Sequence, residues 1–329
     1  MLSQLAFFVR LVAFLTLLNS FFSFADAAAT PLAYKISQDV KGEGFLDAFN
    51  FESISDPTHG RVNYVNRETA LRNNYTFGAG ETFILRPDTV NVLKPDGPGR
   101  DSVRLISKQN YRNHVAVFDI RHMPQGCGTW PAVWEVDPTN WPNGGELDIL
   151  EGANDNGPNA ATLHTSPGCT MPSARGGMLG KQVEENCDAN INNNVGCPVK
   201  FDSDLSYGPK FNNNGGGWYA IERSPAGIKV WFWSRNDPNT PHEICGGLQN
   251  VRPDTWGTPN AFFPDNTCSM EKHFGSHNIV INLTLCGDWA GNTFGIDGCP
   301  GNCVDLVNNS PEAFQNAYFD FASMRVYTP

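Results

Sequence analysis

Residues 144–152 (GGELDILEG) place three carboxylates close together, at Glu146, Asp148 and Glu151. In a strand, alternate side chains share a face, so the first two lie together while the aliphatic residues between them face the core. Regular alternation would bury Glu151, and a charged glutamate in an apolar core is costly. One extra residue at positions 149–150, a β-bulge, predicts that Glu151 returns to the acidic face.

A row of carboxylates on one face could do acid–base and nucleophilic chemistry, because like charges raise one another's pKa. Double-displacement glycoside hydrolysis needs this splitting. One ionised carboxylate attacks the anomeric carbon, and a protonated one serves the leaving oxygen and then activates water. Retention of configuration requires a separation of about 5–5.5 Å between the two groups. A solvated acidic edge and a calcium site are the alternatives for such a strand taken alone.

Tryptophans beside the acidic strand favour a carbohydrate site over these alternatives. Trp130, Trp134 and Trp141 come directly before it. Flat indole faces stack on the C–H faces of sugar rings, while carboxylates bind hydroxyl groups. Trp231 and Trp233, in contrast, alternate with apolar neighbours, which predicts simple packing for both.

The elements that must position this strand are other strands. Thirteen segments of apolar or alternating pattern predict an all-β fold, a jelly-roll-like sandwich of two antiparallel sheets. We expect strands at 33–37, 45–52, 61–65, 82–86, 103–108, 115–121, 131–136, 145–151, 161–165, 217–223, 227–234, 278–286 and 317–328. Helical signals are weak and fall at 67–73 and 311–316. Residues 168–216 have little periodicity and contain three cysteines, which indicates a surface excursion held by disulfides.

Composition excludes several classes of protein and partner. The chain has 329 residues, 40% of them hydrophobic and 17% charged, with a formal net charge of −11. The apolar content is too high for a disordered protein, and the charge density is too low for a coiled coil. The acidic balance without a basic run argues against nucleic acid and anionic membrane as partners. We expect a monomer that needs no cofactor. No dense Asp/Asn loop of the EF-hand type is present, so we assign no metal-binding residues.

The first 27 residues resemble a secretory signal peptide rather than part of the fold. Arg10 precedes an apolar run of about 14 residues, shorter than the ~20 that a membrane span needs. We therefore prefer a leader, residues 1–27, over a transmembrane anchor, and a single domain over residues 28–329. An extracellular location follows. Nine cysteines allow four disulfides and leave one thiol, for which Cys245 is our choice. Asn74 and Asn308 are candidate glycosylation sites in polar surroundings.

Cys187–Cys197 is a plausible short disulfide loop, as is one that involves Cys299 or Cys303, although sequence does not fix the pairing. Asn282 also begins an Asn-x-Thr triplet, but it lies within an apolar strand pattern. We therefore expect this asparagine to be buried or to face a cleft rather than to carry a glycan.

Residues 145–151 resemble the Glu-x-Asp-x-x-Glu signature of glycoside hydrolase family 16, in the bulged form typical of laminarinases, which are endo-β-1,3-glucanases. Further segments resemble the fungal, basidiomycete-type secreted laminarinases. These are DPTHGRVNY at 56–64, GPGRDSVR at 97–104, HMPQGCGTWPAVW at 122–134, TLHT at 162–165 and CGDWAG at 286–291. The resemblance covers roughly residues 33–329. It implies a concanavalin-like β-jelly-roll with an open cleft on the concave sheet.

The resemblance also implies roles for individual residues. Glu146 would be the nucleophile, Glu151 the general acid/base and Asp148 the assisting residue. His164 would hydrogen-bond near the acid or the leaving sugar, with a structural histidine as the alternative. The other residues that the resemblance assigns to substrate binding are Asn63, Arg104, Trp130, Trp134, Trp141, Trp256 and Trp289. A surface salt bridge would explain Arg104 equally well, and Trp256 and Trp289 could be cleft wall or core.

Three functions are compatible with these residues. The first is a retaining endo-hydrolase of β-1,3- or mixed β-1,3/1,4-glucan, with β-glucan polysaccharide as the partner molecule. The second is a transglycosylase that remodels cell-wall glucan, but such relatives usually have the unbulged motif and often a membrane anchor. The third is a non-catalytic β-glucan-binding protein, in which one or both glutamates are typically replaced. Both are intact here, so we favour the hydrolase.

Overall fold

Alternating apolar side chains build two large antiparallel sheets in the computed structural model, which describes residues 33–329. The predicted leader, residues 1–27, lies outside the described residues. The strands are β1 (Tyr34–Val40), β2 (Phe49–Phe51), β3 (Val62–Tyr64), β4 (Thr76–Ala79), β5 (Thr82–Leu85), β6 (Arg100–Ser102), β7 (Arg104–Tyr111), β8 (His114–His122), β9 (Thr129–Val136), β10 (Glu146–Glu151), β11 (Ala160–His164), β12 (Lys181–Gln182), β13 (Val199–Lys200), β14 (Gly217–Ser224), β15 (Gly227–Ser234), β16 (Asn250–Val251), β17 (Ala261–Pro264), β18 (His277–Leu285) and β19 (Phe319–Thr328).

Helices are short and connect strands. They are α1 (Gly44–Ala48), α2 (Arg67–Arg72), α3 (Gly208–Asn213), α4 (His242–Cys245), α5 (Met270–His273) and α6 (Cys303–Asn309). Single turns of tighter or wider helix are η1 (Asn192–Asn194), η2 (Asp204–Ser206), η3 (Pro253–Thr255), η4 (Gly287–Gly291) and η5 (Pro311–Phe314). No helix within residues 33–329 is long and apolar enough to cross a membrane.

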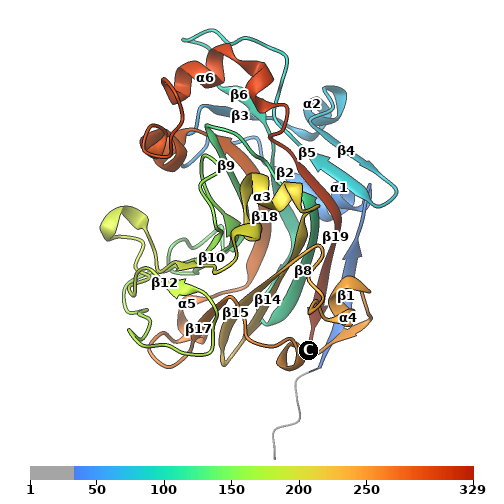
Figure 1. Cartoon of the computed structure of the whole chain (residues 1–329), viewed down its shortest axis with the longest axis vertical. Coiled ribbons are helices and arrows are strands. Elements are labelled where there is room, and N and C mark those ends of the chain that lie inside the picture. The colour runs from blue at the N-terminus through green and yellow to red at the C-terminus, as the bar shows by residue number, and fades with distance from the viewer. Residues whose placement is uncertain (1–32) are drawn as a thin grey trace, which may run out of the picture. The chain divides into compact units, whose positions relative to one another are not determined.

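The strand order defines two layers, which we call sheet A and sheet B. Sheet A has nine strands in the order β16-β1-β19-β8-β14-β15-β17, with β4 and β5 joined to it through β19. Sheet B has eight, in the order β12-β13-β11-β10-β9-β18-β7-β2. Figure 1 shows the strands of the two sheets as two layers, with α6 and α2 at one end. A small parallel pair, β3 and β6, lies outside both sheets. The predicted all-β sandwich is confirmed.

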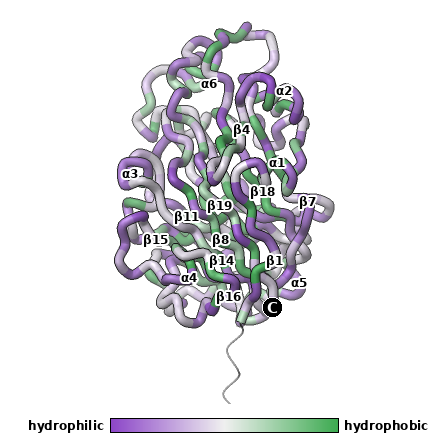
Figure 2. The backbone as a smooth tube through the Cα atoms, turned by 90° about the vertical axis from the view of Figure 1, so that its right-hand side faces the viewer, coloured by the Kyte–Doolittle hydropathy of each residue, from purple (hydrophilic) through white to green (hydrophobic). Residues whose placement is uncertain are grey.

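The main core lies between the two sheets. Phe118 and Tyr219 of sheet A and Leu147 and Ile281 of sheet B are completely buried in one apolar cluster. A second, smaller cluster includes Val117, Trp231 and Trp256 and covers the other face of sheet A. Figure 2 shows hydrophobic segments along β8, β14 and β19, with hydrophilic loops around them. Burial of apolar surface between the layers therefore fixes which face of each strand points outward.

Each of the thirteen expected strands corresponds to an observed one, with one partial exception. Residues 45–52 begin as helix α1 and become strand only at Phe49. Phe45 and Phe49 are four residues apart and their rings stack, with centroids 5.9 Å apart, which is a helical spacing inside an apparently alternating segment. Six further strands of two to four residues have no visible sequence pattern: β4, β6, β12, β13, β16 and β17.

Four disulfides hold the loops, and they contain all the cysteines except Cys245. The pairs are Cys127–Cys299, Cys169–Cys268, Cys187–Cys197 and Cys286–Cys303. The expected short loop 187–197 and the exposed thiol of Cys245 are confirmed. Two of the pairs fix the excursion 168–216 to itself and to the segment before α5. Residues 33–329 form one compact unit.

Candidate active site

The acidic strand β10 lies in sheet B between β9 and β11. Its pairing with β9 shifts between Asp148, which faces Trp134, and Leu150, which faces Val133. Leu147, Ile149 and Leu150 are all completely buried, whereas Glu146 and Glu151 are partly exposed. The predicted bulge is therefore confirmed, and it brings both glutamates to the outer face of sheet B.

The bulge is braced by an asparagine that sequence reasoning missed. The side-chain oxygen of Asn159 accepts a hydrogen bond from the backbone N–H of Glu151, at 2.9 Å. Its amide group donates to the carbonyl oxygen of Ile149, also at 2.9 Å. These two bonds replace ladder bonds that a bulge leaves unmade. Asn159 is completely buried, and no sequence motif predicts its role in the bulge.

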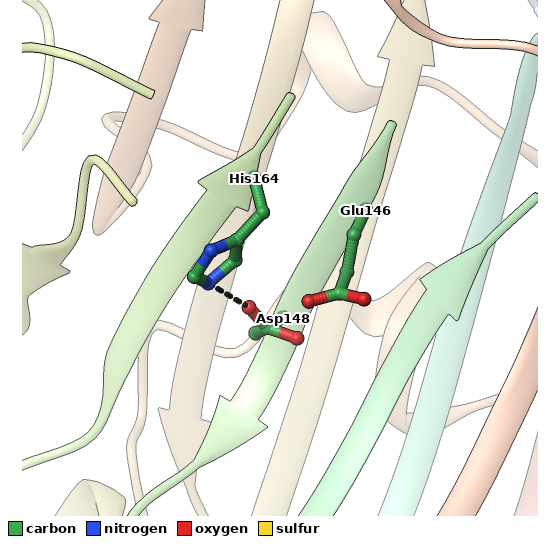
Figure 3. Close-up of side chains that lie close together, drawn as sticks. All are labelled: Glu146, Asp148 and His164. Carbon is green, nitrogen blue, oxygen red and sulfur yellow. Dashed lines mark ion pairs between the residues drawn. The ribbon is translucent and has the colours of Figure 1, made fainter. Parts of the chain in front are cut away.

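His164 lies on the neighbouring strand β11, directly opposite Glu146 in the register. Its Nε2 contacts Oδ2 of Asp148 at 3.2 Å, as Figure 3 shows. The expected position of His164, beside the acidic strand, is confirmed. Ligand atoms of Glu146, Asp148 and His164 lie within 4.8 Å of one another. The three could in principle hold a cation, but the imidazole would first have to release its proton.

Burial and neighbouring charges give the two glutamates different raised pKa values. Burial and then the charge of Asp148 raise the pKa of Glu146 to about 7. The same two causes, in the same order, raise the pKa of Glu151 well above its ordinary value of 4.5. Burial lowers the pKa of His164, but its hydrogen bond with Asp148 and the charge of that residue raise it to about 10. Near neutral pH, Glu146 can be ionised while Glu151 keeps its proton, and the imidazolium stays paired with Asp148.

Four of the predicted aromatic residues surround these groups. Trp130 donates its indole N–H to Oε1 of Glu151 at 2.8 Å, and its ring meets that of Trp289 edge-on, 5.7 Å between centroids. Trp134 lies across from Asp148 on β9. Trp141 lies near Glu146, where it lowers the pKa of that carboxyl group, and is 46% exposed. Exposed indole faces next to carboxyl groups form a surface on which sugar rings can stack.

Arg104 reaches the same face through contacts that hold its charge in place. Its Nε donates to Glu52 at 2.7 Å, and its guanidinium lies 4.9 Å from the centre of the Trp134 ring. The ion pair that we considered as an alternative therefore exists, but it lies against the cleft tryptophan. Trp134 also donates its N–H to Asn282, at 2.7 Å, and Asn282 is buried as expected.

Asn63 lies in a neighbouring pocket rather than beside the carboxylates. It is exposed on β3, donates to Asp101 at 2.6 Å, and helps line a surface pocket of about 490 Å³. The next residue, Tyr64, also lines this pocket, and its hydroxyl accepts a hydrogen bond from Asn282 at 3.3 Å. Asn282 thus links this pocket to Trp134 through two hydrogen bonds.

Two predicted residues do not belong to the surfaces that we expected. Trp256 is 5% exposed and packs edge-on against Trp231, at 5.2 Å, in the cluster on the other face of sheet A. It is a packing residue, as Trp231 and Trp233 were predicted to be. Asn308 is 4% exposed, and its side-chain oxygen accepts a hydrogen bond from Arg61 at 2.9 Å. Polar neighbours in the sequence hid this burial, and we no longer regard Asn308 as a glycosylation site.

Comparison with known proteins gives a consistent result. The profile of the XgeA-like, catalytic GH16 domain matches residues 49–327. A probable endo-1,3(4)-β-glucanase of Aspergillus clavatus is 39% identical over 307 residues, which are 90% of this chain and 46% of that protein. The chain thus spans less than half the length of this relative.

Two solved structures cover 90% of this chain and their own full length. One is the GH16 laminarinase 16A of Phanerochaete chrysosporium with two β-glucans in its donor and acceptor sites, at 56% identity and a TM-score of 0.89. The other is an elongating GH family 16 β-1,3-glucosyltransferase, at 35% identity and a TM-score of 0.83. With a family profile that matches most of the sequence and a bulged strand with both glutamates intact, the chain belongs to glycoside hydrolase family 16.

Proposed function

We propose that the protein is a secreted, retaining endo-β-1,3(4)-glucanase that hydrolyses laminarin-type and mixed-linkage β-glucans. The observation that carries the proposal is the bulged strand β10, on which Glu146 and Glu151 share the outer face but differ in their raised pKa values. The similarity to laminarinase 16A supports the substrate class.

In the proposed reaction, ionised Glu146 attacks the anomeric carbon and forms a covalent glycosyl ester. The glycosidic oxygen leaves with the proton of Glu151. The carboxylate of Glu151 then takes a proton from water, the resulting hydroxide attacks the anomeric carbon, and Glu146 is released. Asp148, paired with His164, maintains a negative charge beside both glutamates, which keeps the proton on Glu151 in the resting site.

Substrate positioning follows from the surrounding side chains. Trp134 and Trp141 would stack against sugar rings on the donor side, and Trp130 and Trp289 lie beside the acid Glu151. Arg104 and Asn63 would bind glucose hydroxyls, the latter from the pocket beside the cleft. We also propose that the protein acts as a monomer and uses no metal or cofactor.

Proton NMR of purified protein acting on laminarin, and separately on lichenan, tests the proposal. The β-anomer should appear first and convert slowly to the α-anomer, and the products should be oligosaccharides rather than glucose. Initial release of the α-anomer would contradict retention. Products longer than the substrate at high acceptor concentration would favour transglycosylation, the kind of activity for which the similar elongating β-1,3-glucosyltransferase is named.

The nucleophile is tested by Glu146→Gln, which replaces the nucleophilic carboxylate with a neutral amide of the same size. We expect turnover to fall by about 10⁴-fold or more while glucan binding and folding are retained. Near-normal activity would show that Glu146 is not the nucleophile. Loss of binding as well would show that the variant is misfolded, so affinity electrophoresis on laminarin serves as its control.

Secretion and glycosylation complete the proposal. Four disulfides and fungal relatives are consistent with an oxidising location. N-terminal sequencing of protein from culture medium should begin near Ala28, after the predicted leader. Asn74 is exposed at the turn before β4, and Asn74→Gln should remove the mass that an N-glycosidase releases.

A further inference from the structure

The loop closed by the Cys187–Cys197 disulfide lies against His164. Its two ends are bonded to the backbone on either side of this histidine. The N–H of Thr165 donates to the carbonyl oxygen of Cys187 at 2.8 Å, and the N–H of Cys197 donates to the carbonyl oxygen of Leu163 at 3.1 Å. The loop therefore cannot shift along β11 without breaking bonds next to the site.

One residue of this loop contacts the imidazole itself. The side-chain oxygen of Asn194 lies 2.8 Å from Nδ1 of His164. The other ring nitrogen faces Asp148, so the imidazole is held from both sides, and Figure 3 shows the second of these contacts. An acceptor at Nδ1 requires a proton there and fixes the plane of the ring, which aims Nε2 at Asp148.

The ion pair of Asp148 depends on this orientation of the His164 ring. Oδ2 of Asp148 is buried, and the contact with Nε2 of His164 is its one ion pair among residues 33–329. A ring that turned away would leave a buried carboxylate oxygen without any partner, which is costly. It would also change the charge that Glu146 and Glu151 experience.

The loop adopts an unfavourable backbone to make the contact. Asn192, Asn193 and Asn194 have φ angles of 50°, 56° and 58°, in the left-handed region that L-residues rarely occupy. Gly196 follows, and a Cβ there would lie 2.5 Å from the carbonyl oxygen of Leu163 and 2.8 Å from Cε1 of His164. Such a conformation persists when its surroundings enforce it, as the disulfide and the flanking hydrogen bonds do here.

We propose that Asn194 is a positioning residue for catalysis, and that the Cys187–Cys197 loop is built to hold its side-chain oxygen against His164. The proposal rests on the proposed function, since it assigns a task within that same site. Among residues 33–329, the Asn194 side chain has no hydrogen bond with Glu146, Asp148 or Glu151; its contact is with His164. It acts through His164 on Asp148, and Asp148 acts on the two glutamates.

A matched pair of glycine variants separates this role from the conformation of the loop. Asn194→Gly and Asn193→Gly each relieve one left-handed residue, but the first alone removes the contact with His164. We expect kcat of Asn194→Gly to fall about 10–100-fold, the range seen when groups that orient a functional histidine are removed. Its KM should stay within about twofold, because the proposed task of Asn194 is to orient the imidazole and not to bind sugar. Asn193→Gly should keep both constants.

Rescue provides a second kinetic readout. Asn194→Asp retains an oxygen acceptor at the same place and should recover most of the lost kcat. Equal kcat values for Asn194→Gly and Asn193→Gly would overturn the proposal. So would a loss that appears in KM alone, because a misplaced loop that obstructs the cleft would give that result.

Nitrogen-15 NMR of the imidazole tests the contact without any turnover. The Nδ1 resonance of His164, identified by its absence in His164→Gln, should move in Asn194→Gly and stay in place in Asn193→Gly. An unchanged resonance in Asn194→Gly would overturn the inference even if glucan hydrolysis is demonstrated. A wild-type protein that hydrolyses neither glucan would instead overturn the proposed function, while the NMR result would still report on the contact.

Discussion

Two sets of charged side chains lie on opposite faces of sheet B and have opposite electrostatic character. On the outer face of sheet B, Glu146 and Glu151 lie beside Asp148 with raised pKa values. On the inner face, Glu135 of β9 lies directly opposite Leu147, one position from both Glu146 and Asp148. Glu135 is completely buried, yet its charge is fully compensated.

The partners of Glu135 come from three other strands. Nε2 of His114 lies 2.8 Å from one carboxylate oxygen and Nη1 of Arg223 lies 3.2 Å from the other. Burial alone would raise the pKa of Glu135, but the charges of His114 and Arg223 outweigh it and hold the pKa at about 2. Burial and then the charge of Arg223 lower the pKa of His277 to about 3, so this imidazole is neutral near pH 7. Its Nε2 lies 2.7 Å from the carbonyl oxygen of Gly144, just before β10. We call these four residues the inner cluster.

This contrast distinguishes a carboxylate that stabilises the fold from those that we propose for catalysis. In the inner cluster, the carboxylate of Glu135 is paired with His114 and Arg223. These contacts link sheet B to sheet A on the inner side of the acidic strand. Within the described part of the chain, the outer glutamates have no such ion pair. Their raised pKa values allow each of them to gain or lose a proton during a reaction. Natural proteins accept such local instability where chemistry requires it. Four variants and conditions test this division, taken here in order of decreasing effect.

The largest effect should come from Glu151→Ala, on rate alone. Loss of the general acid should lower kcat by about 10²–10⁴-fold, while the melting temperature stays equal or rises, because a strained carboxyl group has been removed. Azide, or substrates with good leaving groups, should restore turnover, since only proton transfer has been lost. A fall in melting temperature without a fall in kcat would show that Glu151 stabilises the fold and does not take part in catalysis.

Removing the inner carboxylate should have the opposite result. Glu135→Gln leaves Arg223 buried without its counter-ion, and breaking a buried pair in this way costs about 3–5 kcal/mol. Urea unfolding followed by tryptophan fluorescence measures the loss. The kcat per folded molecule should change little at a temperature where the variant is folded. An unchanged free energy of unfolding would show that the ion pairs of the inner cluster do not stabilise the contact between the sheets.

The two faces should also give stability curves of opposite slope with pH. Glu135 titrates at about 2 in the folded protein against an ordinary 4.5, so its contribution is present above 4.5 and is lost as pH falls toward 2. Glu146 titrates at about 7, so its contribution is present below 4.5 and is lost as pH rises toward 7. Relative to wild type, Glu146→Gln should therefore gain stability between pH 4.5 and 7. Parallel unfolding curves for the two proteins across that window would contradict this assignment.

The smallest effect should appear at the edge of the cleft. Trp141 is 46% exposed, so Trp141→Ala should raise KM about tenfold through lost stacking and leave stability within about 0.5 kcal/mol. Trp256→Ala is the matched control on the opposite side of the molecule. It should lower stability by about 3–5 kcal/mol and leave KM unchanged. Steady-state kinetics and thermal unfolding of both variants decide whether Trp256 is correctly assigned to packing.

Prediction from sequence succeeded where local pattern and global packing agree. The bulge at 149–150 followed from the cost of burying one charge, and the long strands followed from alternation. For Trp256 the motif left cleft wall and core open, and the structure shows the core. The reasoning failed for Asn308, because a polar neighbourhood in the sequence does not determine which surface a side chain contacts. Asn159 and Asn194 could not be predicted at all. Each acts through a contact between segments that only the folded chain brings together.

Sheet A cannot be completed until β19, which is synthesised after its neighbours β1 and β8, is available to pair with them. β19 follows every other strand along the chain, yet it lies between β1 and β8 in sheet A. The neighbouring strands β8, β14 and β15 pair antiparallel and can associate earlier. A ribosome adds about 5–20 residues per second, so the edge of β8 stays open until residues 319–328 emerge. During that interval, this edge is the place where nascent chains would associate with one another.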